Sequence, residues 1–395
     1  MRTEHLRALT GVRFFAALWV VVYHSVRHNS GLLHANYPNA LHVVAPVAGA
    51  GARGVDLFFM LSGFVLALTY LDRMGGRLEL RGTLRFLWLR LARIWPLYIL
   101  VLLGAAVLRI LRHEAWGTSD TATLTWANLL RQALMVQQWF KPEQGPVSWV
   151  GPAWSLSAEW LAYLVFPVVV LAVTLGHRRL RARTLLLLSV LTMVPLVVSI
   201  SSHGDLTDWV WIPRILCEFV TGMVLCAGLS RLDLTPQGRR LAGVGAIASV
   251  AAVVGWLYVV RAAELAPHDA SFVVVLFLPL IACLAIGTGP LNAFLSTRAL
   301  VLGGGISYAL YLVHSPMLYL FRDVTRYTGT FYLEPLPRYY GELLFIPVIV
   351  FTAWLLYRFF EEPVRERMRA QLDRSIARSP ITSPSDATTA APTKP

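Results

Sequence analysis

The sequence predicts an all-α integral membrane protein, a bundle of about ten transmembrane helices with both termini in the cytoplasm. Of its 395 residues, 56% are hydrophobic and only 14% are charged, whereas a soluble domain carries about a quarter charged residues. Apolar runs of about 20 residues, each long enough to cross a bilayer as a helix, recur along the chain. Because these runs are continuous rather than alternating, a transmembrane β-barrel is disfavoured.

Ten apolar runs define the predicted spans, and the arginines between them define the orientation. Placing the N-terminus inside puts most lysines and arginines on the cytoplasmic side, as the positive-inside rule requires. The segment 126–140 is also apolar, but it is short and contains Arg131 and glutamines, so we interpret it as interfacial or re-entrant. The predicted spans are 8–27, 53–71, 91–110, 153–175, 184–201, 211–229, 241–260, 271–288, 300–320 and 341–358.

The chain is expected to form one membrane domain, residues 1–370, followed by a disordered cytoplasmic tail, residues 371–395. The tail is rich in Ser, Thr, Pro and Ala, a composition that does not form a packed core. The net charge of +13 does not indicate nucleic acid, because the arginines fall in short loops between spans. The three cysteines show no metal-ligand spacing, and no metal is expected.

The first span carries two ionisable side chains, Arg13 and His24, that are costly to hold at membrane depth. An ionisable residue inside a membrane helix suggests a functional site. The two residues are separated by about three helical turns, so they share one face and lie roughly 16 Å apart along the axis. Ionisable residues of other spans at the membrane depth of Arg13 or of His24 are therefore candidates for the same site.

The predicted topology places Asp56, Glu159 and His314 at about the depth of His24 in the outer half of the membrane. A histidine oriented by a carboxylate can remove the proton from a hydroxyl as it attacks a carbonyl. His24 is therefore predicted to be catalytic, with Asp56 or Glu159 as its partner. Asp56 could instead cap its helix, and His314 could simply hydrogen-bond a neighbouring helix.

Three arginines, Arg13, Arg90 and Arg93, are predicted near the inner face. Arg90 and Arg93 are neighbours on one helical face, and clustered arginines at a helix N-terminus suit a polyphosphate. Alternatively, these arginines set the orientation of the chain in the membrane and contact lipid headgroups. A phosphate site roughly 16 Å from a base favours a long, thin donor such as acyl-CoA, whose pantetheine arm has about that reach.

Six segments of the chain resemble, in order, the motifs of the acyltransferase 3 family of multipass membrane enzymes. They are LRALTGVRFFAALWVVVYHS, GVDLFFMLSGFVL, RLARIWP, WSLSAEW, GISYALYLVHSP and FEEPVR. The likeness covers roughly residues 5–365. It implies transfer of an acyl group, commonly acetyl, from acyl-CoA to a hydroxyl, usually on a carbohydrate.

The resemblance also assigns residues. The essential arginine and histidine of the family fall on Arg13 and His24, its paired arginines on Arg90 and Arg93, and its acidic position on Glu159. Many members carry a fused extracytoplasmic hydrolase-like domain, which is not seen in this chain, so the transfer is expected to finish within the membrane domain. Compact members include antibiotic-tailoring enzymes such as macrolide O-acyltransferases.

Three further residues complete the predicted site. Ser62, in the SGF element, is assigned with the arginines to the donor, and Ser307 and His314 are assigned to the acceptor. Expected partners are acyl-CoA, with acetyl-CoA the simplest donor, a carbohydrate or glycosylated acceptor, and the lipids of the plasma membrane. Nucleic acid is not expected, and a homo-oligomer is left open.

The sequence therefore predicts an O-acyltransferase with His24 as general base, and it leaves rivals open. A covalent acyl-histidine intermediate is the alternative mechanism. The alternative function is a proton-coupled transporter or flippase, whose buried histidines and carboxylates would relay protons. A structural scaffold is the third alternative, although it needs no buried ionisable cluster.

Overall fold

The computed structural model describes residues 3–28, 38–117, 120–140, 148–203, 209–328 and 338–378. These residues are almost entirely helical, with no strand among them. In lipid every backbone polar group must be satisfied within its own segment, which helices achieve and irregular chain does not. The predicted all-α class is confirmed.

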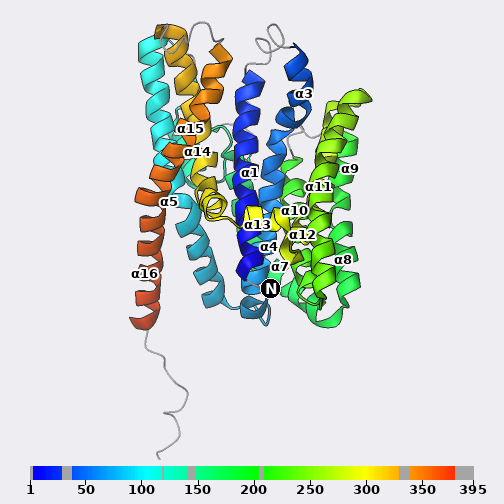
Figure 1. Ribbon diagram of the computed structural model, residues 1–395. Coiled ribbons are helices and arrows are strands. Elements are labelled where there is room, and N and C mark those ends of the chain that lie inside the picture. Colours follow the sequence, from blue (N-terminus) through cyan, green and yellow to red (C-terminus); the bar gives the residue numbers. More distant parts are fainter. Residues whose placement is uncertain are drawn as a thin grey trace, which may run out of the picture.

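The helices stand side by side and mostly parallel to one long axis (Figure 1). In chain order they are α1 (Thr3–His28), α3 (Pro38–Gly49), η1 (Gly51–Arg53), α4 (Gly54–Met74), α5 (Leu80–Trp116), η2 (Asp120–Thr123), α6 (Trp126–Ala133), α7 (Trp154–Arg179), α8 (Ala182–Leu191), α9 (Val194–His203), α10 (Trp211–Leu229), α11 (Pro236–Ala262), η3 (Pro267–Phe272), α12 (Val273–Ile286), α13 (Pro290–Leu295), α14 (Arg298–Thr328), α15 (Arg338–Leu356), η4 (Tyr357–Glu361) and α16 (Glu362–Arg378).

Ten helical stretches among the described residues are long and apolar enough to cross a membrane, and they coincide with the ten predicted spans. The segment predicted to be interfacial or re-entrant contains only the short helix α6, which is not one of the ten. The ten are Arg7–Arg27, Val43–Met74, Leu80–Trp116, Trp154–Arg179, Ala182–Ser202, Trp211–Leu229, Pro236–Ala262, His268–Ile286, Arg298–Tyr327 and Leu344–Ser375.

The N-terminus and the end of α16 lie on the same side of the bundle, the lower side in Figure 1. Helix α16 continues to Arg378, so the structure is helical over the first part of the predicted tail, and the rest of that tail lies outside the described residues. The local sequence is rich in helix-forming residues. In addition, α16 contacts α5, where the indole Nε1 of Trp88 donates to the Met368 backbone oxygen at 3.2 Å.

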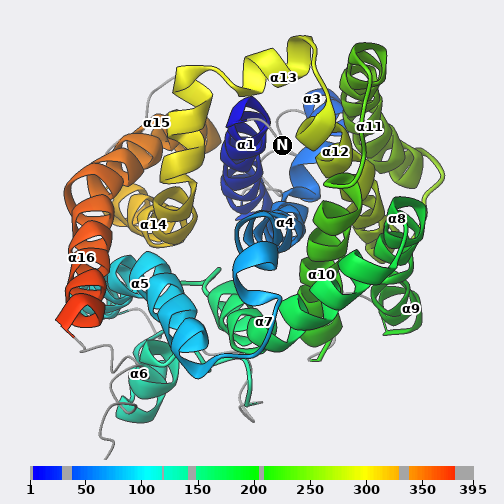
Figure 2. The same ribbon diagram turned by 90° about the horizontal axis from the view of Figure 1, so that it is seen from below.

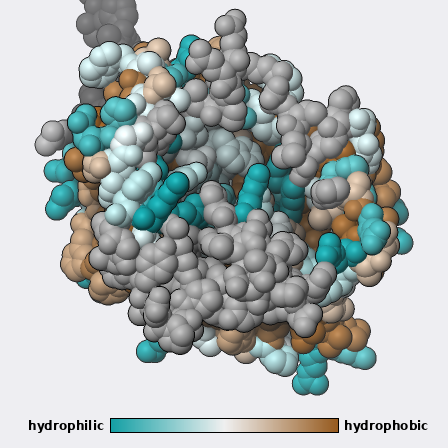
Figure 3. Space-filling model, turned by 90° about the horizontal axis from the view of Figure 1, so that it is seen from above, coloured by the Kyte–Doolittle hydropathy of each residue, from teal (hydrophilic) through white to brown (hydrophobic). Residues whose placement is uncertain are grey.

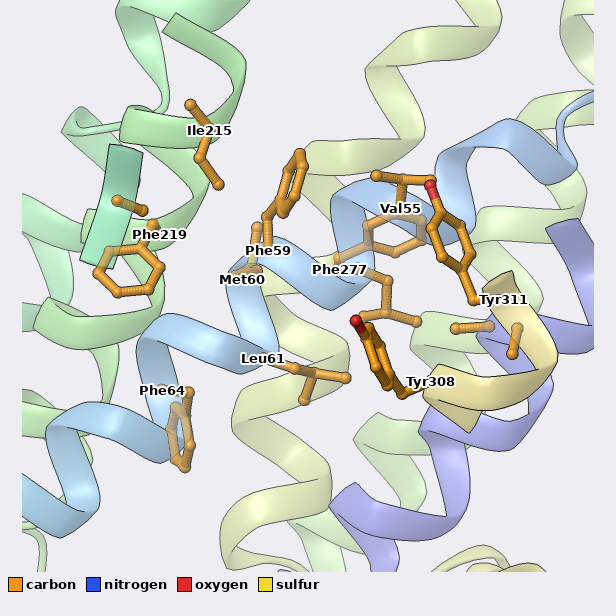
Figure 4. Packing of buried hydrophobic residues seen from close by; sticks show 14 of the residues in the cluster. Val55, Phe59, Met60, Leu61, Phe64, Ile215, Phe219, Phe277, Tyr308 and Tyr311 are labelled. Carbon is orange, nitrogen blue, oxygen red and sulfur yellow. The ribbon is translucent and has the colours of Figure 1, made fainter. Parts of the chain in front are cut away.

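Helices α1 and α4 lie inside a ring formed by the other helices (Figure 2). Large apolar side chains of α4 fill the space between α10 on one side and α14 on the other (Figure 4). Buried members of this core are Phe59, Met60, Leu61, Phe64, Ile215, Phe219, Tyr308 and Tyr311.

Helices α4 and α10 approach so closely that glycine is required at the contact. A Cβ atom at Gly63 would lie 1.9 Å from the Phe219 backbone oxygen, and one at Gly222 would lie 2.0 Å from the Met60 backbone oxygen. Small residues allow membrane helices to pack backbone against backbone. Helices α1 and α14 meet in the same way, because a Cβ atom at Gly304 would lie 1.9 Å from the Thr10 backbone oxygen.

We expect Gly222→Ala to destabilise the protein, because the added methyl group forces α10 away from α4. Overpacking of this kind costs about 1–3 kcal/mol. Gly255→Ala on α11 is the matched control, since a Cβ atom there meets nothing within 4 Å. Thermal unfolding in detergent should show a lower midpoint for Gly222→Ala alone, and equal midpoints for the two variants would contradict the packing described.

Candidate active site

Two histidines from α1 and α14 meet in the upper half of the bundle. Nε2 of His314 lies 3.3 Å from Nδ1 of His24, and the two ring centroids are 5.0 Å apart. His314 is fully buried, whereas His24 is partly exposed. The close approach of α1 and α14 at Gly304 makes this contact possible. The two residues predicted to share one depth therefore lie in direct contact.

The neighbouring backbone carbonyl oxygens indicate which nitrogen of each histidine ring carries the proton. Nδ1 of His24 lies 2.9 Å from the Val20 backbone oxygen, and Nδ1 of His314 lies 3.3 Å from that of Leu310. A carbonyl oxygen can only accept, so each Nδ1 is assigned the proton. Nε2 of His314 then accepts from Nδ1 of His24. Consequently Nε2 of His24 carries the lone pair of its ring, as a general base requires.

A tyrosine ties the histidine pair to the start of α7. The ring centroid of Tyr311 lies 5.9 Å from that of His314. The Tyr311 hydroxyl donates to the Pro152 backbone oxygen at 2.8 Å and lies 2.7 Å from Oγ of Ser155. The Ser155 hydroxyl also donates to the Pro152 backbone oxygen at 3.2 Å, so the three groups form one hydrogen-bond network. The segment WSLSAEW is thereby fixed against α14.

Glu159 lies with the arginines rather than with His24. Its Oε1 atom accepts from Oγ of Ser62 at 3.1 Å and from the hydroxyl of Tyr163 at 2.5 Å, and Glu159 is an electrostatic neighbour of Arg13. The predicted pairing of Glu159 with His24 is therefore corrected. The reason is that residues 149–150 and 152–153, just before α7, are themselves buried, so α7 begins inside the bundle and Glu159 lies deeper than its distance from the helix start suggests.

Two of the arginines predicted to bind the donor have buried nitrogen atoms without partners. In the part of the chain that the structure describes, Nε of Arg13 and Nε of Arg90 donate to no hydrogen-bond acceptor. Their guanidinium groups lie 5.7 Å over the ring of Phe58 and 5.9 Å over that of Phe86, respectively. A buried charged donor without an acceptor is costly. The two side chains are therefore suited to an anionic ligand.

Arg93, the third predicted arginine, is held by a carboxylate from the end of the last span. Its Nη1 donates to Oε1 of Glu361 at 2.5 Å, and Nη1 of Arg365 lies 3.7 Å from the same oxygen. The single π-helical turn η4 ends at Glu361, which is buried. Such turns often mark functional sites. Arg93 is thus positioned by the segment FEEPVR.

Asp56 neither caps α4 through its side chain nor pairs with His24. Its two oxygens form a bidentate pair with Arg214 of α10, in which Nη2 lies 2.7 Å from Oδ2 and Nε bonds Oδ1. Nη1 of Arg53 lies 3.7 Å from Oδ2. Asp56 is completely buried, and planar bidentate pairing is the strong form of this interaction. The predicted role for Asp56 beside His24 is corrected: it joins α4 to α10.

The remaining predicted residues take local roles. The Ser307 hydroxyl is buried and donates to the Gly304 backbone oxygen of its own helix at 2.8 Å. Ser62 bonds Glu159 beside the arginines, and His314 bonds His24. Within the described residues the structure thus forms two groups: the histidine pair, and a cluster of Arg13, Arg90, Glu159, Ser62 and Tyr163 that we call the arginine cluster.

Sequence reasoning missed four residues of these networks. Tyr163 lies four residues after Glu159, a spacing that puts both on one helical face and that could have revealed it. Glu361 stands in a quoted motif without an assigned role, and Tyr311 lies one turn before His314. Arg214 had no local signal, because its pairing depends on the register between α10 and α4.

A comparison with protein families identifies the family of this chain. The model described as an acyltransferase domain matches residues 6–358. The chain belongs to the acyltransferase 3 family. The resemblance seen in its motifs is confirmed, and the described residues contain ten candidate membrane spans.

Several relatives carry names of the same kind. The chain is 32% identical over 167 residues to acyltransferase MdmB of Streptomyces mycarofaciens, a match that covers 42% of this chain and 40% of the relative. It is 22% identical to the O-acetyltransferase OatA of Staphylococcus aureus over 92% of this chain and 58% of the relative.

The putative peptidoglycan O-acetyltransferase YrhL of Bacillus subtilis is a further relative, 26% identical over 95% of this chain and 58% of the relative. The matches therefore span between 40% and 58% of the length of these three relatives. No solved structure matches the chain.

We expect Asp56→Asn to lower the midpoint of thermal unfolding in detergent, because it deprives the buried guanidinium of Arg214 of its bidentate partner. Breaking a buried pair costs about 3–5 kcal/mol. The matched control is Glu79→Gln, which breaks the exposed pair of Arg77 and Glu79 and should cost less than about 1 kcal/mol. A loss at Asp56 no larger than that at Glu79 would refute the assignment of Asp56 as a link between α4 and α10.

Proposed function

We propose that this protein transfers a short acyl group, acetyl most simply, from acyl-CoA to a hydroxyl group of a carbohydrate or a glycosylated acceptor. His24 is the general base of this reaction. The observation that supports it most directly is the histidine pair, whose hydrogen bonds leave the lone pair of His24 on Nε2. An ionisable group at this depth is otherwise costly, which favours a functional role.

The arginine cluster supports acyl-CoA as the donor. Among the described residues, Arg13 and Arg90 have buried Nε atoms without hydrogen-bond partners, and such guanidinium groups suit a pyrophosphate. Arg13 and His24 lie on one helix, roughly 16 Å apart along its axis. The pantetheine arm of acyl-CoA spans a comparable distance between its phosphates and its thioester. Phosphates at Arg13 would therefore bring the thioester carbonyl to His24.

The reaction proceeds by attack of the acceptor oxygen on the thioester carbonyl. Nε2 of His24 takes the proton of the acceptor hydroxyl as the new carbon–oxygen bond forms. The charge that develops on His24 is stabilised through its Nδ1–H, which points to the Val20 backbone oxygen and to Nε2 of His314. The carbon–sulfur bond then breaks, and His24 returns the proton to the departing CoA thiolate. His314 acts as a positioning residue.

The acceptor would enter from the face opposite the chain termini. That face is hollowed near its centre, and hydrophilic residues gather around the hollow (Figure 3). His24 lies in the last turns of α1, toward the same face. The Bacillus subtilis relative is named as a putative peptidoglycan O-acetyltransferase, which supports a carbohydrate acceptor. The arginine distribution supports a plasma-membrane orientation with both termini in the cytoplasm.

We expect His24→Ala to lower acceptor-dependent release of CoA thiol from acetyl-CoA by about a hundredfold or more, the usual contribution of a general base. CoA binding should stay unchanged, because His24 lies far from the arginine cluster. The assay uses the purified full-length protein with a panel of oligosaccharides, glycolipids and macrolides. Retained turnover in His24→Ala would remove His24 from the mechanism, and absence of acceptor-dependent thiol release by the wild type would refute the proposed function.

A further inference from the structure

The seam between α5 and α16 contains a hollow that the proposed reaction does not use. It has a volume of about 600 Å³ and is lined by Trp88 of α5 and by Gln371, Leu372, Arg374 and Ser375 of α16. Sites for small molecules span about 300–1,000 Å³. The two helices lie side by side along this seam (Figures 1 and 2). The hollow is therefore large enough for a nucleotide.

We propose that this hollow binds the adenosine 3′-phosphate end of the donor. The inference rests on the proposed acyl-CoA donor and adds to it a second, nucleotide-recognising site. Its chemistry suits both parts of the ligand: Trp88 offers an indole that is 36% exposed, and Arg374 offers a guanidinium group. Bases stack on aromatic side chains, and guanidinium groups bind phosphates.

The hydrogen bonds around the hollow hold these two side chains in place. The indole Nε1 of Trp88 donates to the Met368 backbone oxygen at 3.2 Å, which fixes the ring against α16. Nε of Arg374 donates to the Ala370 backbone oxygen at 3.2 Å. Within the described residues this bond leaves the two terminal nitrogens of Arg374 for a ligand. Nearby, Nη2 of Arg85 lies 3.3 Å from Oδ1 of Asp373 and braces the same seam.

The same seam leads from the hollow to the arginine cluster. Trp88 precedes Arg93 by five residues, which is about 7.5 Å along the helix axis. Arg93 pairs across the seam with Glu361, and both are electrostatic neighbours of Arg13. A ribose separates the adenine from the pyrophosphate of CoA by a comparable length. An adenine ring on Trp88 thus places the pyrophosphate near the depth of Arg93, next to the arginine cluster, from where the pantetheine arm reaches His24.

Kinetics with two donors test this site in the full-length protein. Arg374→Ala should raise the KM for acetyl-CoA about tenfold but leave the KM for acetyl-3′-dephospho-CoA unchanged, because that donor lacks the phosphate. Trp88→Ala should raise both KM values about tenfold. Trp88→Phe keeps an aromatic face and should stay close to the wild type, which separates stacking from the hydrogen bond to Met368. Arg369→Ala, an exposed arginine of α16 outside the hollow, is the matched control and should change neither.

Titration with adenosine 3′,5′-bisphosphate separates this inference from the proposed function, because this probe carries the nucleotide end without a thioester. Binding that weakens about tenfold in Trp88→Ala and in Arg374→Ala supports the site. Equal binding in the wild type and both variants, or no binding by any of them, overturns it even if acetyl-CoA is turned over. The expected binding pattern without acetyl transfer would keep the nucleotide site and refute the proposed reaction.

Discussion

The close packing of α1 inside the bundle is the constraint on which the rest of the site depends. The α1 backbone lies against glycines of two neighbours: a Cβ atom at Gly304 of α14 would lie 1.9 Å from the Thr10 oxygen, and one at Gly54 of α4 would lie 2.5 Å from the Ala16 oxygen. Helices packed this tightly cannot slide past one another without clashes. The two ionisable residues of α1 are therefore held at fixed depths relative to the side chains of α4 and α14.

The buried charged side chains of the bundle differ in how completely their polar atoms are satisfied. Asp56 and Arg214 form a complete bidentate pair inside the bundle, which suits a permanent link between helices. Arg13 and Arg90 instead retain buried Nε atoms without partners among the described residues. A protein that only needed a stable bundle would gain from replacing such groups with apolar ones. The anionic donor proposed to bind between them would offset this cost.

The sequence predicts the spans well and the partners poorly, for physical reasons. Length and hydropathy determine which segments cross a membrane. The depth of a residue within a span follows from the helical rise, and this predicts that His24 and His314 lie at one depth. Which side chains meet across two helices depends on their rotation and register, and neither is encoded locally. Arg214 opposite Asp56 is such a case. Glu159 was placed too shallow because the buried segment before α7 shifts the start of that helix inward.

We propose that one donor lies along α1, with its phosphates at Arg13 and its reacting group at His24. A cryo-electron microscopy structure of the full-length protein with a non-hydrolysable thioether analogue of acetyl-CoA tests this arrangement. We expect the pyrophosphate within hydrogen-bond distance of Arg13 and Arg90, and the acyl carbon next to Nε2 of His24. An analogue bound with its phosphates away from the arginine cluster, or with its acyl end away from the histidine pair, would contradict it.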